Sequence, residues 1–172
     1  MLFVVSILFG VASSTVAREI QDGAGKWVYS KEVDPLTDEI FFGAMLKCDQ
    51  TTFADPRYFM IRYTDSKWEM AVIWNQELLS PTSTLLYRFG DGEVEEAVGF
   101  SGDETYWFWF DDQDIERFVL RLLDVDRLVV ALSPKGQIRQ STTFSVRGLG
   151  ETLLPHLDDL GWGHLRTEIR KN

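Results

Sequence analysis

The sequence predicts a mainly β protein of the β-rich α+β class, folded as an antiparallel β-sandwich or curled sheet of about nine strands with two short covering helices. Two observations carry this prediction. Short segments rich in aromatic and β-branched residues follow one another along most of the chain, separated by turn sequences such as TDS at residues 64–66 and GDG at residues 90–92. Apolar residues take a helical spacing in only two places, both in the C-terminal half.

The expected strands are defined by their composition and by the alternation of apolar and polar residues. They cover residues 26–33, 40–48, 57–63, 67–74, 83–89, 93–100, 103–110, 128–132 and 137–146. Segment 128–132 (LVVAL) is continuously apolar, which predicts a strand covered on both faces. Segment 137–146 alternates, so Ile138, Phe144 and Val146 are expected to share one face.

Two helices are expected near the C-terminus. In residues 112–127 the apolar residues recur at the spacing of one helical face: Ile115, Phe118, Val119, Leu122 and Leu123. Asp112 or Asp114 is expected to cap this helix, because a carboxylate accepts hydrogen bonds from the unpaired N–H groups of a first turn. The second helix has its apolar side formed by Leu153, Leu154, Leu157 and Leu160.

The first residues have the pattern of a secretory leader. Residues 2–12 are almost all apolar, no charged residue precedes Arg18, and small residues follow the apolar run. This run is shorter than the roughly 20 apolar residues that span a bilayer, so a signal peptide over residues 1–17 is expected rather than a membrane anchor. Cleavage is expected after Ala17 or, alternatively, after Ala12.

Without the leader, the chain is long enough for one compact domain. The polar, glycine-rich residues 18–26 are expected to form a flexible lead-in. A single β-rich domain is expected at residues 27–162, followed by a C-terminal tail at residues 163–172. No internal repeat or interdomain linker interrupts this organisation, and no integral membrane span remains after cleavage.

The charge and the cysteine content limit the classes of partner and the disulfides that this chain can have. The chain has 17 basic and 27 acidic residues, a formal net charge of −10. Nucleic-acid binding depends on neutralising phosphates with Lys and Arg, so this balance argues against a nucleic-acid partner and against an anionic membrane surface. Cys48 is the single cysteine, which rules out an intrachain disulfide. Cys48 is expected to be a small buried apolar residue.

No sequence motif of a common enzyme class is present. The chain lacks a G-x-S-x-G elbow, an H-E-x-x-H pair, a phosphate-binding glycine loop and a Cys–His signature, so no catalytic residue, cofactor or metal ligand is predicted. His156 and His164 lack the close spacing and third ligand of a zinc site, and solvated or capping roles are expected. The acidic clusters at residues 34–39 and 111–116 are expected to form turns and a helix cap.

The aromatic run Tyr106-Trp107-Phe108-Trp109-Phe110 is the strongest candidate for a binding site. Alternation places Trp107 and Trp109 on one face and the other three rings on the opposite face. One interpretation is an open aromatic platform that stacks on a sugar or peptide. The favoured interpretation places one face in the core and the other under the following helix.

Next to this run, Asp111, Asp112 and Asp114 supply carboxylates. Paired acids of this kind carry out glycoside hydrolysis in other proteins. Tyr106, Trp107, Trp109, Asp111 and Asp112 are therefore the candidate ligand-contacting residues.

The order of several segments resembles a known family. These are VDPLTDEIFFGAML, YFMIRYTDSKWEMAVIW, LLYRFGDG, FVLRLLDVDRLVVALSP and TTFSVRGLGETLLPHLDDLGW. They are similar to the type VI secretion-associated periplasmic accessory proteins (the VasI/TagO group), over about residues 27–162. The shared segments are turns, a helix-to-strand junction and a core strand, not catalytic motifs. The resemblance implies a periplasmic accessory role.

The chain departs from the family pattern at two positions. Members of this family have a cysteine where this chain has Tyr63 and another where it has Leu160. The resemblance therefore implies a disulfide lost as a unit, since one remaining thiol is a liability in an oxidising compartment. Tyr63 and Leu160 are expected to lie close together as apolar replacements, within the roughly 7 Å between Cα atoms that a disulfide allows.

Taken together, these patterns predict a non-enzymatic accessory or binding protein of the cell envelope. It would be exported to the periplasm of a Gram-negative cell and would bind another envelope protein. The alternative is a glycan-binding or glycan-active protein, an enzyme or inhibitor that uses the aromatic run and Asp111, Asp112 and Asp114.

Overall fold

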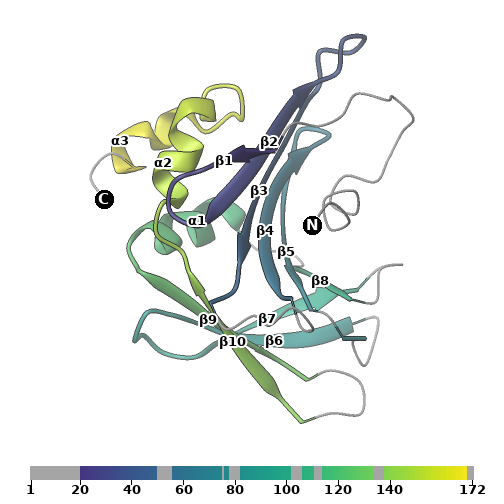
Figure 1. Cartoon of the computed structure of the whole chain (residues 1–172), viewed down its shortest axis with the longest axis vertical. Helices are drawn as coiled ribbons and strands as arrows, with labels where there is room; N and C mark the ends of the chain where they lie inside the picture. Colours follow the sequence, from purple (N-terminus) through teal and green to yellow (C-terminus); the bar gives the residue numbers. More distant parts are fainter. Residues whose placement is uncertain are drawn as a thin grey trace.

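A computed structural model describes residues 20–49, 56–74, 76–77, 82–101, 106–110, 114–133 and 138–169. Ten strands form one sheet in the order β1-β2-β3-β4-β5-β8-β7-β6-β9-β10, and every neighbouring pair is antiparallel. The mainly β class is confirmed, and the architecture is the curled sheet rather than two separate sheets (Figure 1).

The strands have short, regular bounds. They are β1 (Gln21–Asp22), β2 (Trp27–Val33), β3 (Ile40–Lys47), β4 (Tyr58–Thr64), β5 (Lys67–Ile73), β6 (Thr82–Phe89), β7 (Glu95–Phe100), β8 (Trp107–Phe110), β9 (Arg127–Leu132) and β10 (Gln140–Ser145). The helices are α1 (Ile115–Leu123), α2 (Leu149–Leu153) and α3 (Arg166–Ile169), with 3-10 turns η2 (Leu154–His156) and η3 (Gly163–Leu165). All nine expected strands are found.

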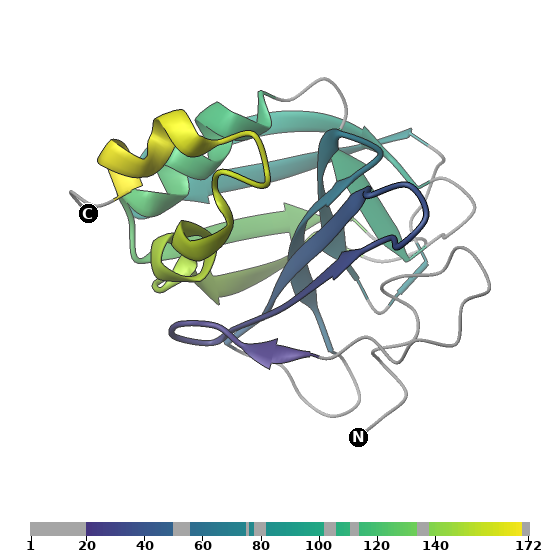
Figure 2. The same cartoon turned by 90° about the horizontal axis from the view of Figure 1, so that it is seen from above.

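The sheet curls so that its two halves cross and enclose the core. Strands β2–β5 stand upright in Figure 1, strands β6–β10 lie across them below, and the helices lie in the angle between the two groups. From above, the green and yellow helices gather at one side of the strands (Figure 2). We call the face of the sheet toward this core the inner face and the opposite one the outer face.

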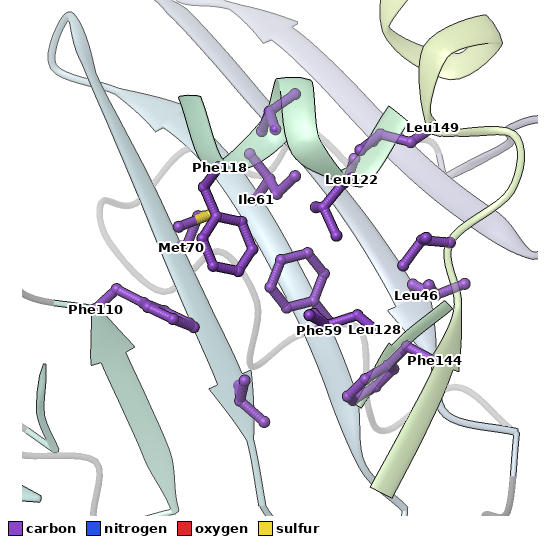
Figure 3. Packing of buried hydrophobic residues seen from close by; sticks show 14 of the residues in the cluster. Leu46, Phe59, Ile61, Met70, Phe110, Phe118, Leu122, Leu128, Phe144 and Leu149 are labelled. Atoms are coloured by element: carbon purple, nitrogen blue, oxygen red, sulfur yellow. The ribbon is translucent and has the colours of Figure 1, made fainter. Parts of the chain in front are cut away.

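Aromatic side chains fill the angle inside the curl. Phe59 of β4 lies 6.3 Å from Phe118 of α1 and 6.0 Å from Phe144 of β10, measured between ring centroids (Figure 3). All three rings are at most 4% exposed. Burying side chains of this size contributes about 2–3 kcal/mol each, which explains how a domain without a disulfide holds its curl.

Helix α1 forms because its sequence supplies an N-cap at its start and an apolar stripe that packs in the core. The Asp114 carboxylate accepts a hydrogen bond from the Arg117 backbone N–H at 3.0 Å, as expected for an N-cap. Phe118, Val119 and Leu122 are buried along the predicted stripe. Of the two expected caps, Asp114 is the one observed, while Asp112 lies outside the described residues.

The N-terminal part of the described chain is tied to α2 by close backbone packing. Gly148 has φ +88°, and an added Cβ there would collide with the backbone carbonyl of Ala24. The Ala24 N–H also donates to Thr152 Oγ1 at 2.9 Å. The expectation of a flexible lead-in is therefore wrong for Gln21–Asp22, which pair with β2 as strand β1.

Three further expectations are corrected by the burial of side chains. Residues 163–169 are not a tail, because η3 and α3 place Leu165 and Ile169 in the core, each 4% exposed. Strand β9 is buried on one face only, since Leu128 and Val130 are fully buried while Val129 is partly exposed. Ile138 precedes β10 and is 86% exposed, so it does not share a face with Phe144.

The last strand has a protected edge. The backbone carbonyl of Thr143 accepts a hydrogen bond from the Asp49 N–H at 2.9 Å, and that of Ser141 accepts one from Arg57 Nη1 at 3.1 Å. Unpaired strand edges invite pairing with other chains. These contacts, from a residue shortly after β3 and one just before β4, occupy carbonyls that β10 would otherwise offer to another strand.

Candidate binding face on the outer side of the sheet

An apolar row crosses the outer face of six strands. Residues that lie directly opposite each other in antiparallel strands share a face. The strand registers place the following residues side by side in one row: Val28, Met45, Met60, Ala71, Trp109 and Phe100. This outer row is distinct from the core, because Met45, Met60, Ala71 and Trp107 form a separate apolar cluster.

No helix of the described chain contributes to this outer cluster, whose members all come from strands β2, β3, β4, β5 and β8. Helix α1 packs on the inner face, where Phe118 lies 5.4 Å from Phe110. The expectation that the core covers one face of this run and the following helix the other is therefore wrong, because the core and α1 both lie on the inner face. The helix follows Phe110 into the angle of the curl, where the larger apolar surface lies.

The two tryptophans of β8 are packed against each other and against a charged pair. The rings of Trp107 and Trp109 are stacked with centroids 5.2 Å apart and an interplanar angle of 14°. The Arg62 guanidinium lies 4.2 Å from the ring centroid of Trp109, and Arg62 Nε donates to Glu69 Oε2 at 2.5 Å. Since Trp107 is only 4% exposed, its ring is not accessible to a ligand.

The accessible part of the outer face lies on β7, next to this pair. Val98 is 53% exposed and Phe100 is 46% exposed, and alternation places both on the same face as Glu96. Val94, immediately before β7, is 62% exposed. Val94, Glu96, Val98 and Phe100 are hereafter called the β7 stripe. Phe100 lies opposite Trp109 in the sheet, so the stripe continues the outer row.

Residues of β7 turn their larger apolar side chains outward because the inner face there has little room. Ala97 is buried at 1% exposure, and a Cβ on Gly99 would collide with the ring of Phe108. The sequence EVEEAVGF indicates this arrangement. Its small residues Ala97 and Gly99 occupy alternate positions, and its large apolar residues occupy the positions between them and so lie on the opposite face. Sequence reasoning did not single out Val98 or Phe100.

The other predicted ligand-contacting residues are dispersed. Tyr106 is 52% exposed and its carbonyl accepts a hydrogen bond from the Trp74 N–H at 2.7 Å. Asp111 and Asp112 lie outside the described residues. Asp114 is engaged in capping α1. The structure therefore brings Trp107 and Trp109 together but shows no converging pair of acids among these described positions.

Tyr63 and Leu160, the positions of the implied lost disulfide, contact the same side chain. The rings of Tyr63 and Trp68 lie 5.2 Å apart. Trp68 Nε1 donates to the Leu160 carbonyl at 3.3 Å. Leu160 is 1% exposed and Tyr63 packs against the core, so both positions carry apolar contacts.

The two histidines lie in different surroundings. The His156 ring is 5.1 Å from Tyr29 and 5.3 Å from Phe42, and its buried Nε2 has no hydrogen-bond partner. Burial, and secondarily the nearby Lys31, lower the pKa of His156, while Asp159 acts in the opposite direction. His156 is thus partly enclosed by aromatic rings rather than solvated. His164 Nε2 lies 3.1 Å from Glu116 Oε1.

The described residues contain a cavity but neither a metal site nor a membrane-spanning helix. They contain no group of three or more His, Cys, Asp or Glu side chains placed to hold a metal ion. No helix among them is long and apolar enough to cross a bilayer. A cavity of about 480 Å³ lies between the ends of α1, α2 and α3, lined by leucines such as Leu123 and Leu154 with Asp126 and Arg147 at its rim. Cys48 is buried and free, as expected.

The curled sheet with its helices is shared with a solved structure. Invasion associated protein B from Bartonella henselae matches with a TM-score of 0.55 and 13% sequence identity, over 83% of this chain and 98% of that chain. At this identity the likeness concerns the fold. Neither a scan against family models nor a search of curated proteins returns a match.

Proposed function

We propose that this protein is an exported, non-enzymatic binding protein of the cell envelope that contacts another protein through the outer face of its sheet. The observation that carries the proposal is the exposure of Val98 and Phe100 in continuity with the outer row. Exposed apolar patches on a folded domain mark interaction sites. Met45, Met60 and Ala71 of the outer row are at most 8% exposed, so the β7 stripe is the part of this face that a partner is expected to contact.

The leader pattern and the resemblance to type VI secretion-associated proteins support a periplasmic accessory role. Export predicts that the chain purified from an osmotic-shock fraction begins at Arg18 or, with the alternative cleavage, at Ser13. N-terminal sequencing and intact mass measure this directly. A full-length chain recovered from the cytoplasm would contradict the export part of the proposal.

Binding through the outer face is tested by site-specific photocrosslinking in cells. A photoreactive phenylalanine at Val98 is expected to form a discrete crosslinked product with an envelope protein. The same probe at Val33 is the matched control, because Val33 is also half exposed but lies at the end of β2 near the hairpin tip. Equal products from both positions, or none from Val98, would contradict the proposal.

The alternative glycan-binding function has less support. The exposed Tyr106 favours it, while the burial of Trp107 removes the ring that a sugar would stack on. A peptidoglycan pull-down compares the two functions. The glycan alternative requires retention that is lost in Tyr106→Ala, whereas binding through the β7 stripe predicts no such dependence.

A further inference from the structure

From the β7 stripe we infer that the partner presents an apolar surface that carries basic side chains. This inference rests on the proposed function and specifies the chemistry of the partner. It starts from the alternation within the stripe, in which exposed Glu96 separates Val98 and Phe100 from Val94. A partner that covers the two apolar ends of the stripe must also meet the carboxylate in its middle.

The Glu96 carboxylate forms no ion pair within the described chain, unlike the carboxylates of Glu95 and Asp91. Glu95 points to the inner side and binds Arg121, with 2.5 Å between Glu95 Oε1 and Arg121 Nη2. Asp91, in the β6–β7 turn, pairs with Arg127. Leu86 of β6 lies opposite Glu96, and Arg88 follows it on the same face; among the described residues no ion pair joins Arg88 to Glu96. Exposed Glu93 adds a second unpaired carboxylate beside Val94.

Covering these carboxylates with an uncharged surface would be costly, because a buried charge needs a partner of opposite sign. A lysine or arginine in the facing surface supplies that partner and steers the encounter toward this acidic chain. The apolar ends of the stripe then supply the buried contact, with Phe100 as the aromatic anchor next to Trp109.

The same charges argue against a second copy of this chain as the occupant. Two copies meeting face to face would bring Glu93 and Glu96 of each together, and each chain has a formal net charge of −10. Like charges across an interface disfavour association. An anionic lipid surface is disfavoured for the same reason.

The test uses two synthetic peptides of equal length, one alternating Leu and Lys and the other alternating Leu and Glu, titrated into the purified protein by calorimetry. The inference predicts saturable binding of the Leu/Lys peptide and none of the Leu/Glu peptide. Glu96→Lys is expected to weaken binding by about tenfold or more and Phe100→Ser by a similar factor. Glu39→Lys makes the same charge change on the β2–β3 hairpin and is expected to change affinity less than twofold.

Each outcome decides between the alternatives. Equal weakening by Glu96→Lys and Glu39→Lys would show that only net charge attracts the peptide, and this would overturn the inference. Binding of both peptides with the same affinity would overturn it as well. A dimer in sedimentation that Phe100→Ser dissociates would assign the stripe to a second copy. Thermal melts of each variant confirm that it is folded.

The inference can fail while the proposed function stands. If the probe at Val98 captures an envelope protein and Glu96→Lys leaves that product unchanged, the face binds a partner but not through a basic surface. If Val98 yields no product, the proposed function fails irrespective of the peptide result.

Discussion

The indole rings of Trp68 and Trp162 lie nearly parallel, with their centroids 3.7 Å apart and an interplanar angle of 8°. This stack joins β5 to the segment that follows α2, and the Trp68 Nε1–H donates to the Leu160 carbonyl beside it. The stack and this hydrogen bond hold the C-terminal segment against the sheet in a chain that has no disulfide.

Trp162→Ala is expected to lower the free energy of unfolding by about 3–5 kcal/mol, because it empties the space of a ring that is only 5% exposed. Urea denaturation measures the change. Tyr106→Ala is the control, since Tyr106 is 52% exposed and its truncation should cost less than about 1 kcal/mol. Similar losses in the two variants would contradict the role of the stack.

The proposed family resemblance predicts that cysteines at positions 63 and 160 form a disulfide, and the shared contact of Tyr63 and Leu160 with Trp68 places both positions in one region. In a Cys48→Ala background, the oxidised double variant should migrate faster on a non-reducing gel and contain no titratable thiol. The disulfide should also raise the midpoint of thermal unfolding, since it restricts the unfolded chain. Two free thiols after air oxidation would show that the positions are too far apart.

The pH dependence of stability between about pH 7 and pH 5 is expected to reflect His156. Burial lowers its pKa in the folded protein, followed by the effect of Lys31. The unfolded chain, with a histidine pKa near 6.5, then binds the proton more readily, so stability falls as the pH drops below about 6.5.

Urea denaturation at pH 7.5 and pH 5.5 measures this slope. His156→Phe keeps a ring between Tyr29 and Phe42 and should flatten it. The lowered pKa of Asp159, caused first by its hydrogen bond with Lys31, affects stability only at lower pH, near the normal range of a carboxyl. An unchanged slope in His156→Phe would assign the pH dependence to other groups.

Alanine substitutions at two glycines with positive φ allow the cost of backbone strain to be distinguished from the cost of a steric collision. Gly161→Ala, at φ +74° with no atom within 4 Å of the added Cβ, should cost about 1 kcal/mol for strain alone. Gly148→Ala, at φ +88°, adds a collision with the backbone of Ala24 and Gly25 and should cost clearly more. The free energies of unfolding from urea denaturation give the comparison. Equal costs would contradict the tight packing of the chain before β2 against α2.

Local sequence patterns predicted most strands and the helix α1, because alternation and helical spacing depend only on residues that are close in sequence. The strands, the α1 stripe with Phe118 and the Asp114 cap were all expected from such patterns. The order of the strands in the sheet could not be predicted, because the pairings of β5 with β8 and β6 with β9 join segments that are distant in sequence. The helix α3 in residues 163–169 cannot be predicted from the sequence, because its four residues are too few to show a helical period.

The candidate site was only partly predictable for a related reason. Trp107 and Phe108 are both large and apolar, so alternation identified two faces but not which one meets α1. The outward position of Phe100 depends on Gly99 accommodating the Phe108 ring, a contact between different strands. Exposed residues of this kind are identified only when the inner packing is known.

The most direct test of the account measures stability and binding in one variant, Phe100→Ser. Phe100 is 46% exposed on the outer face, whereas Phe110 on the inner face is 9% exposed. Phe100→Ser should change the free energy of unfolding by less than about 1 kcal/mol and abolish the crosslink from position 98, while Phe110→Ser should cost about 3 kcal/mol or more. A Phe100→Ser protein that loses stability to the same extent as Phe110→Ser, or that keeps the crosslink, would contradict the division of this sheet into a folding face and a binding face.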